Sequence, residues 1–258
     1  MIEHIKPNKI LSRYIKNYTV VEINSSAGFL KSDRVFPTGN SCLVFHYGTP
    51  SKFNPQESNE YIEPTLVVCG QQTSYYDLSL SGNTGMILIT FKPHGLKALF
   101  SFPARELQNE NLALELLLKN EANILEGRLL NSISTKERIN HLETFLLKRL
   151  SGSRDYERID YAIQLIENSK GQISTQKLSQ EACLGIKQFE RIFSAHVGLT
   201  PKKFSGIIRF RNVIQMKNKN QNLYQLAYDN GYYDQSHFIH DFKSLTGLTP
   251  RVFFKEGS

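Results

Sequence analysis

Short apolar runs separated by turn-forming residues fill the first hundred positions of the chain. The runs are rich in β-branched and aromatic residues, and Gly, Pro, Asn and Ser punctuate them. Runs of this kind and spacing are typical of an antiparallel sandwich or a small barrel. The expected strands are Tyr18–Ile23 (YTVVEI), Ser41–Tyr47 (SCLVFHY), Thr65–Cys69 (TLVVC) and Met86–Phe91 (MILITF).

The hydrophobic pattern becomes helical from Gly95 onward. Apolar residues there recur at intervals of three and four, which places them on one face of a helix. The expected helices cover Leu112–Leu118, Ile124–Leu130 and Ile139–Leu150.

A small polar stretch at 151–153 (SGS) marks an expected linker. Because 258 residues suffice for two domains of ordinary size, we expect a β-rich domain with C-terminal helices at 1–150 and an all-helical domain at 154–258. The fold class is therefore α+β. The second domain opens with an amphipathic helix whose apolar face holds Ile159, Ala162, Ile163 and Ile166.

An internal repeat is the strongest signal in the chain. Residues 189–204 (FERIFSAHVGLTPKKF) and 238–253 (FIHDFKSLTGLTPRVF) are identical at seven of sixteen aligned positions. Self-similarity of this kind implies one supersecondary unit that is used twice. In each copy two phenylalanines four residues apart share one face of a helix.

Glycine and proline mark the ends of the repeated helices. Gly198 and Gly247 can adopt the left-handed conformation that terminates a helix. In each copy a threonine follows as the expected N-cap of the next helix, and a proline then occupies its first turn, where proline is tolerated. These positions are Thr200 and Pro201 in the first copy, and Thr249 and Pro250 in the second.

A short helix is expected upstream of each phenylalanine helix. The first covers Thr175–Ala182 after a cap at Ser174 or Thr175, and the second covers Leu223–Asp229 after a cap at Asn222. Tight glycine turns follow both, and a short helix, a glycine turn and an amphipathic helix make a helix-turn-helix. Between the copies, Lys202–Lys217 is long enough for one connecting helix of about 24 Å at 1.5 Å per residue.

The positive charge of the chain is confined to its last third. The net charge is +7, and residues 170–258 carry 13 Lys and Arg against 6 Asp and Glu, whereas residues 1–169 carry 18 of each. A neutral first part and a basic second part suggest a polyanion-binding module joined to another domain.

At these motifs the sequence resembles the AraC/XylS family of bacterial transcription regulators. The resemblance covers roughly 155–255 and rests on both Gly-Leu-Thr-Pro signatures, the connecting segment PKKF…IIRFRN and the stretch LAYDNGYYDQSHFIHDFKSLTGLTP. The N-terminal segments RVFPTGNSCLVFHYG and ITFKPHGLKALF resemble a sensor-type domain found ahead of this unit in some members. That resemblance implies a β-rich, cupin-like fold.

The resemblance implies that the second helix of each unit enters the major groove of DNA. Arg191 suits a forked contact to guanine and Gln235 suits adenine, whereas His240 stands where family members commonly carry arginine. A solvated surface is the alternative role for these side chains. The base-reading candidates are Lys187, Glu190, Arg191, Gln235, Ser236, His237 and His240, and the phosphate-contacting candidates are Lys202, Lys203, Lys243 and Arg251.

The N-terminal domain offers polar residues that invite an enzymatic hypothesis, namely His46, His94, Arg34 and Tyr47. The strands contain no His-x-His pair with a following carboxylate, and the chain has no Gly-rich phosphate loop and no nucleophile elbow. We therefore expect no catalytic residue, no metal and no cofactor. Tyr75, Tyr76, Phe91 and Phe45 line a pocket or pack in the core, and the three cysteines, Cys42, Cys69 and Cys183, are expected to be reduced and buried.

Two classes of function follow from these observations. The favoured one is a transcription regulator that reads two successive major grooves of double-stranded DNA, with 1–150 as a sensing or dimerising domain. Its candidate partners are DNA, a small-molecule effector, RNA polymerase and a second copy of the chain. The alternative is a cupin-like metalloenzyme with an accessory DNA-targeting domain. The chain lacks the roughly 18 continuous apolar residues of a membrane helix and lacks a signal peptide, so we expect a cytoplasmic protein without a membrane partner.

Overall fold

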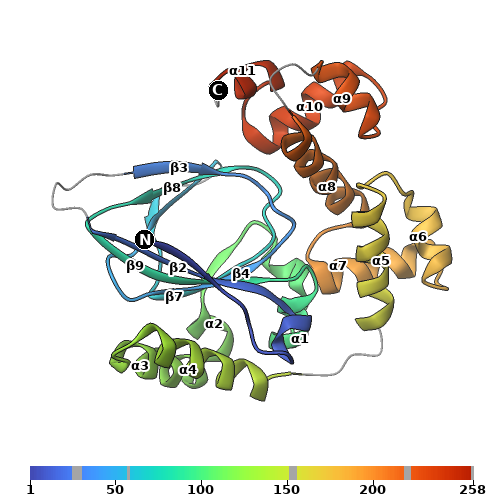
Figure 1. Ribbon diagram of the computed structural model, residues 1–258. Helices are drawn as coiled ribbons and strands as arrows, with labels where there is room; N and C mark the ends of the chain where they lie inside the picture. The colour runs from blue at the N-terminus through green and yellow to red at the C-terminus, as the bar shows by residue number, and fades with distance from the viewer. Residues whose placement is uncertain (25–30, 57–58, 151–155, 218–221, 257–258) are drawn as a thin grey trace.

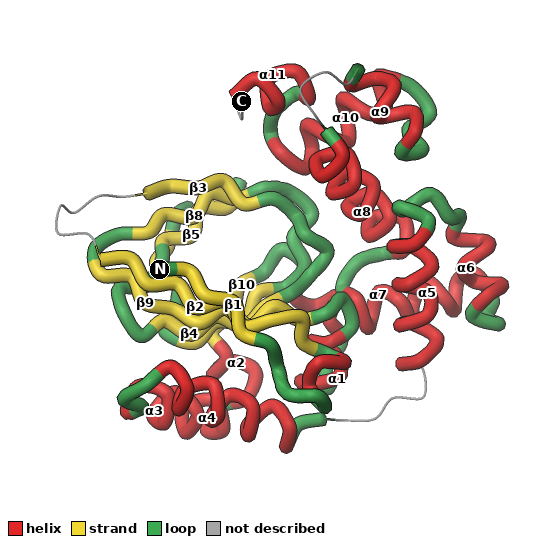
Figure 2. The backbone as a smooth tube through the Cα atoms, in the orientation of Figure 1, coloured by secondary structure: helices red, strands yellow, loops and turns green. Residues whose placement is uncertain are grey.

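Two antiparallel sheets face each other in the N-terminal part of the molecule (Figures 1 and 2). The computed structural model describes residues 1–24, 31–56, 59–150, 156–217 and 222–256. The six-stranded sheet has the order β1-β2-β9-β4-β7-β10 and the four-stranded sheet the order β3-β8-β5-β6. The strands are β1 Ile2–Ile5, β2 Ile15–Asn24, β3 Lys31–Val35, β4 Cys42–His46, β5 Lys52–Pro55, β6 Tyr61–Ile62, β7 Leu66–Cys69, β8 Tyr76–Leu80, β9 Asn83–Phe91 and β10 Asn111–Ala113.

The central strands of the six-stranded sheet are buried on both faces. Successive side chains of a strand point to opposite faces, so Leu43 and Phe45 of β4 pack under the helices, while Val44 belongs to a separate cluster that faces the other sheet. The four predicted strands are β2, β4, β7 and β9, all in this sheet, because double burial produces continuous apolar runs. The four-stranded sheet is less buried, as the half-exposed β8 shows, and its strands were not predicted.

Helices cover the outer face of the six-stranded sheet (Figure 1). One prediction is wrong here: the segment Leu112–Leu118 is not a single helix, because β10 pairs with β7 and sets Leu112 opposite Val68 before the helix starts.

Among the described residues, no helix is long and apolar enough to cross a membrane. The elements of this part are the 3-10 helices η1 Leu11–Arg13 and η2 Ala104–Leu107 and the α-helices α1 Gly95–Phe100, α2 Leu114–Leu118, α3 Asn120–Asn131 and α4 Thr135–Lys148.

The C-terminal part is all-helical and has a hydrophobic cluster of its own. The predicted apolar face of α5 is buried, with Ile159 and Ile166 fully enclosed. The division into 1–150 and 154–258 is still a prediction, and the predicted linker lies outside the described residues. The helices are α5 Tyr156–Asn168, α6 Thr175–Glu181, α7 Ile186–Val197, α8 Pro201–Met216, α9 Leu223–Asp229, α10 Gln235–Thr246 and α11 Pro250–Glu256.

Candidate nucleic-acid interface

The first helix-turn-helix unit consists of α6 and α7. Ser174 caps α6 by accepting a hydrogen bond from the Lys177 backbone N–H at 3.2 Å. A tight turn follows, and α7 then runs to Gly198, which adopts the left-handed conformation with φ 89°. Phe189 and Phe193 are fully buried on the inner face of α7, so the opposite face is free to meet a partner.

The second unit repeats this arrangement with α9 and α10. The Asn222 side chain caps α9 by accepting from two backbone N–H groups, and α10 ends at Gly247 with φ 76°. Phe238 and Phe242 are fully buried, as their counterparts in the first unit are. The cap of α10 is Asp234, whose carboxylate accepts from the His237 backbone N–H at 2.7 Å. The sequence analysis did not assign this cap, although aspartate is among the preferred N-cap residues.

The connecting helix α8 joins the two units (Figure 1). Its 16 residues correspond to about 24 Å at 1.5 Å per residue. The side chain of Thr200 caps it, accepting from the Lys203 N–H at 3.3 Å. Phe204 packs against Phe193 of the first unit, with ring centroids 5.9 Å apart, and Phe210 packs against Phe242 of the second at 5.2 Å. Aromatic contacts with both units, from Phe204 near the start of α8 and from Phe210 in its middle, fix how the units pack on this helix.

The base-reading candidates of the first unit lie on α7 away from its phenylalanines. Lys187 and Arg191 are exposed, whereas Glu190 is half-buried. The two cations can therefore reach a polyanion, and the carboxylate of Glu190 is less accessible than they are.

The base-reading candidates of the second unit are all exposed on α10. A carboxylate that the sequence analysis missed lies between the two histidines: Asp241 is 3.3 Å from His237 Nε2 and 3.7 Å from His240 Nδ1. The spacing of His237 and Asp241, four residues apart on a helix, was the available signal. Gln235 and Ser236 are the first two residues of α10 and follow its N-cap, Asp234.

The phosphate-contacting candidates are exposed, but the two units differ in charge. Residues 174–198 carry 3 Lys and Arg against 2 Asp and Glu, and residues 222–256 carry 3 against 4. The connecting segment 201–217 carries 5 basic residues and no acidic one. The excess positive charge therefore lies on α8, with Lys202 and Lys203 exposed in its first turn, and not on the second unit.

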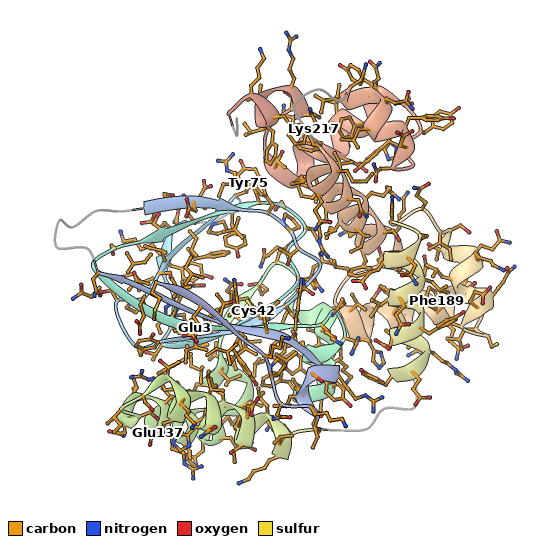
Figure 3. The ribbon with its side chains drawn as sticks, viewed as in Figure 1. Glu3, Cys42, Tyr75, Glu137, Phe189 and Lys217 are labelled. Atoms are coloured by element: carbon orange, nitrogen blue, oxygen red, sulfur yellow. The ribbon has the colours of Figure 1, made fainter. Side chains whose placement is uncertain are left out.

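The N-terminal part contacts both candidate reading helices at their C-terminal glycines. A Cβ atom on Gly198 would lie 3.1 Å from the Ala104 carbonyl oxygen, and one on Gly247 would lie 2.3 Å from the Tyr75 ring. In Figure 3 Tyr75 lies on the side of the β sheets that faces the second unit. Beside it, Arg34 Nη1 donates to the Thr246 carbonyl oxygen at 3.4 Å. Each glycine thus ends a helix and also permits this close approach.

The connecting helix is held at the same interface. Arg211 Nη1 donates to the Thr38 carbonyl oxygen at 3.1 Å. Phe36 reaches into the helical core, where its ring lies 6.3 Å from Phe210 and 5.3 Å from Phe253. The N-terminal part therefore contacts α7, α8 and the second unit together, and it can influence how the two reading helices are presented.

A buried histidine joins the N-terminal part to α5. His94 Nε2 is 2.7 Å from the Tyr156 hydroxyl, and His94 Nδ1 is 3.6 Å from Asp160. Burial lowers the pKa of His94 to about 4, against an opposing effect of Asp160. The imidazole is therefore neutral at pH 7.

The residues of the enzymatic hypothesis do not converge on one site. His46 pairs with Glu63 at 3.3 Å between the sheets, whereas His94 lies at the interface with α5. Arg34 pairs with Asp77, and the Tyr47 hydroxyl donates to Glu22. The described part of the chain contains no group of three His, Cys, Asp or Glu residues arranged to hold a metal ion.

The aromatic candidates divide between core and surface. Phe45 and Phe91 are fully buried in the core under the helices. Tyr76 lines a cavity of about 340 Å³ that opens between the sheets and α8, and Tyr75 belongs to the contact with Gly247. Lys16 and Arg211 also line this cavity, so it receives cations from both parts of the chain.

The cysteines depart from the expectation that all three are buried. Cys69 is buried, Cys42 is partly exposed and Cys183 is exposed. Cys183 has a positive φ of 54° in the tight turn between α6 and α7, and such a turn lies at the surface.

Comparison with known proteins finds similar sequences for the helix-turn-helix part of the chain. Residues 178–256 match a family model described as a helix-turn-helix domain. The HTH-type transcriptional regulator ArgR of Pseudomonas aeruginosa is 26% identical over 146 residues, which are 55% of this chain and 44% of that protein. The C-terminal part of the chain is therefore similar to the DNA-binding part of these helix-turn-helix transcription regulators. The HTH-type transcriptional activator RhaS of Mannheimia succiniciproducens is 29% identical over 91 residues, 34% of each chain.

The remaining comparisons concern the N-terminal part of the chain and solved structures. Residues 3–113 match a model described as a domain of unknown function (DUF6597). The structure of ToxT from Vibrio cholerae covers 92% of this chain and 97% of that one, at 15% identity and a TM-score of 0.46. The AraC-like transcriptional activator CuxR covers 89% and 91%, at 15% identity and a TM-score of 0.27. The chain spans less than half the length of the curated relatives it matches.

Proposed function

We propose that the protein is a transcription regulator that reads two successive major grooves of double-stranded DNA. The observation that carries the proposal is the pair of helix-turn-helix units that α8 joins, each packed against it by an aromatic contact (Figure 1). Successive major grooves on one face of DNA lie about 34 Å apart, and a spacer of about 24 Å plus the lateral offset of each reading helix approaches that distance. The cytoplasm is the expected compartment.

The two units read different sequences in this proposal. Lys187 and Arg191 present cations in the first unit, and Gln235 and Ser236 present neutral donors and acceptors in the second. Since a reading helix discriminates bases through such groups, the site for one chain is two unlike boxes about ten base pairs apart. A palindrome would arise only from a second copy of the chain.

A small-molecule effector is the candidate controlling signal. The cavity of about 340 Å³ lies against α8 and is lined by side chains from both sides of the interface, including Asn17, Asn40 and Arg211. Its volume lies within the range of about 300–1,000 Å³ that ligand pockets occupy. A ligand seated there would contact the helix that spaces the two units, which gives it a route to the DNA-binding surface.

Selection of bound genomic fragments by the full-length protein, followed by a footprint, tests the DNA proposal. We expect protection of two neighbouring major grooves on one face, and a log affinity that falls linearly with log salt concentration. Base changes in either box should weaken binding. Protection of one groove, with no effect of changes one helical turn away, would mean that the second unit only supports the first.

Arg191→Ala sharpens the test at one base pair. If Arg191 makes a forked contact to guanine, its loss costs roughly 1–3 kcal/mol at that position and relaxes the sequence preference there. Gln188→Ala is the matched control, because Gln188 is an exposed neighbour on α7 to which no base contact is assigned. If Arg191→Ala keeps the same preferred DNA site, the assignment of Arg191 as a base-reading residue is wrong.

The remaining proposals concern partners and chemistry. We propose that the protein is not an enzyme and that its regulatory output passes through RNA polymerase or through a second copy bound at 1–150. Metal analysis of the dialysed full-length protein addresses the alternative of a cupin-like metalloenzyme. Stoichiometric zinc, iron or manganese would favour that alternative.

A further inference from the structure

Two of the three cysteines form a pair that the sequence does not reveal. Cys42 opens β4 and Cys69 ends β7, and the antiparallel register sets them directly opposite each other. Residues opposite each other on antiparallel strands have Cα atoms about 4.5–5.5 Å apart, within the range of about 4.4–6.8 Å that disulfides span. Cys183 lies alone and exposed in the turn after α6.

Both thiols of the pair face the space between the sheets. They pack with Val44 and Val67, which form the next opposed pair on the same face of these two strands. Both cysteines also line the cavity of about 340 Å³, and Figure 3 shows Cys42 inside the β-sheet part of the molecule. A small molecule that enters the cavity therefore meets two neighbouring thiols.

The surroundings give the two sulfurs different roles. Hydrogen bonding with Cys42 and then burial raise the pKa of Cys69, and the nearby carboxylate of Glu63 adds to this effect. Cys69 therefore stays protonated. Cys42 is more exposed, and the cations Lys16 and Arg211 line the same cavity. A peroxide that enters the cavity therefore reaches the more exposed sulfur first, so Cys42 is the attacking sulfur.

We propose that Cys42 and Cys69 are a modification site at which a hydroperoxide oxidises the folded protein to an intramolecular disulfide. The Cys42 thiolate attacks the terminal peroxide oxygen; an S–O bond forms, the O–O bond breaks, and the leaving oxygen takes up a proton. The Cys69 sulfur then attacks the sulfenic acid; the S–S bond forms, the S–O bond breaks, and the departing hydroxide leaves as water with the Cys69 proton. Two thiols lose two electrons and the peroxide gains them. This proposal does not depend on DNA binding.

The cysteine pair lies close in sequence to Gly39 and Gln71, two residues that contact the helical part. Gln71, two residues after Cys69, donates from Nε2 to the Gly39 carbonyl oxygen at 2.8 Å. A Cβ atom on Gly39 would lie 3.0 Å from the Phe204 ring of α8, and one on Gly198 would lie 3.2 Å from Gln71. Oxidation would therefore join covalently the strand ends that carry contacts to α7 and α8.

Peptide mapping of the full-length protein tests the proposal. The reduced protein is treated with a small molar excess of hydrogen peroxide, its remaining thiols are alkylated in denaturant, and the peptides are identified by mass. We expect a Cys42–Cys69 linked peptide that has lost two hydrogen atoms, while its alkylated forms disappear together. Cys183→Ser should form the same link. Oxidation of Cys183 while Cys42 and Cys69 remain alkylatable would overturn the proposal, as would a link that forms only after unfolding in urea.

Single variants test the order of the two steps. In Cys69→Ser the sulfenic acid should persist on Cys42 and be trapped by dimedone, because the resolving thiol is absent. In Cys42→Ser dimedone should label Cys69 far more slowly, since that thiol is buried and protonated. Equal labelling of the two sulfurs would contradict the assigned roles. The map of the wild-type protein decides the disulfide itself even if a variant fails to fold.

Discussion

The two helix-turn-helix units have the same interior but different surfaces. Each buries two phenylalanines on its second helix and ends that helix at a left-handed glycine that touches the N-terminal part. Outside this shared frame, the first unit presents Lys187 and Arg191 on its reading helix, whereas the second presents histidines that flank Asp241. Packing constrains the interior of both copies alike, and the exposed face was free to diverge.

This difference implies a division of labour on DNA. Non-specific attraction to phosphates depends on Lys and Arg, and these are concentrated on α8. The second unit carries 3 basic and 4 acidic residues between 222 and 256, so its contribution to affinity must come from base contacts or from position. Paired substitutions in the two units separate these roles.

The largest effects should come from the shared interior. Phe189→Ala and Phe238→Ala each remove a fully buried ring, and such truncations cost roughly 3–5 kcal/mol. Because the two sites are equivalent in packing, urea unfolding should give similar losses of the free energy of unfolding. A loss at Phe238 well below that at Phe189 would show that the second unit is the looser of the two.

The next prediction concerns the pH dependence of stability, which involves the first helix of the C-terminal part and not the second unit. His94 contacts Tyr156 and Asp160 of α5, the first helix of the C-terminal part. Burial lowers the pKa of His94 to about 4. The second unit has no described counterpart of this contact. In the unfolded chain His94 binds a proton below about pH 6.5, whereas in the folded protein it stays neutral until the pH approaches 4. The stability that depends on a neutral His94 is therefore fully present above pH 6.5. It is lost as the pH falls toward 4, by on the order of 3 kcal/mol.

The measurement is the difference in unfolding free energy between pH 7 and pH 4 in wild type and in His94→Gln. The variant should lose less stability on acidification than the wild type does. Gln188→Ala is the control, because Gln188 is exposed on α7 and its side chain does not titrate, so its loss should leave the pH dependence of stability unchanged. Equal acid sensitivity of wild type and His94→Gln would contradict the assignment.

The parts that the sequence predicted are those with periodic burial. The repeat predicted both reading helices and their glycine ends, because Phe189 and Phe193, or Phe238 and Phe242, recur on one helical face. The four-stranded sheet was missed because its half-exposed strands lack continuous apolar runs. Which exposed side chains read DNA is still a prediction.

Contacts between segments that are distant in the sequence could not be predicted from it. The pairing of Cys42 with Cys69 depends on strand register, and the approach of Tyr75 to Gly247 depends on how the two parts dock. Neither leaves a periodic signal in the chain. Such contacts required the structure, and they carry the features by which the N-terminal part can act on the helices.

A smaller effect concerns the two glycines that touch the N-terminal part. Gly247→Ala and Gly198→Ala each force a left-handed conformation on alanine, which costs about 1–2 kcal/mol. Gly247→Ala also pushes into the Tyr75 ring, whereas Gly198→Ala meets the backbone oxygen of Ala104. In thermal unfolding, Tyr75→Ala should therefore restore part of the stability lost in Gly247→Ala and none of that lost in Gly198→Ala. Equal rescue of both would show that Tyr75 does not contact the second unit specifically.

The smallest effect separates phosphate contacts of α8 from those of the second unit. Lys203→Ala and Lys243→Ala should each weaken binding on all sequences about equally and lower the salt slope by about 1, because a phosphate contact positions the protein without reading bases. Lys136→Ala is the matched control, since Lys136 is exposed on α4, away from the helical part (Figure 1). The affinity of each variant is measured at several salt concentrations on the selected site and on unrelated DNA. If Lys203→Ala lowers the slope and Lys243→Ala does not, the second unit approaches DNA without this phosphate contact. Its role would then rest on Gln235 and its exposed neighbours, and base changes in the second box would become the decisive measurement.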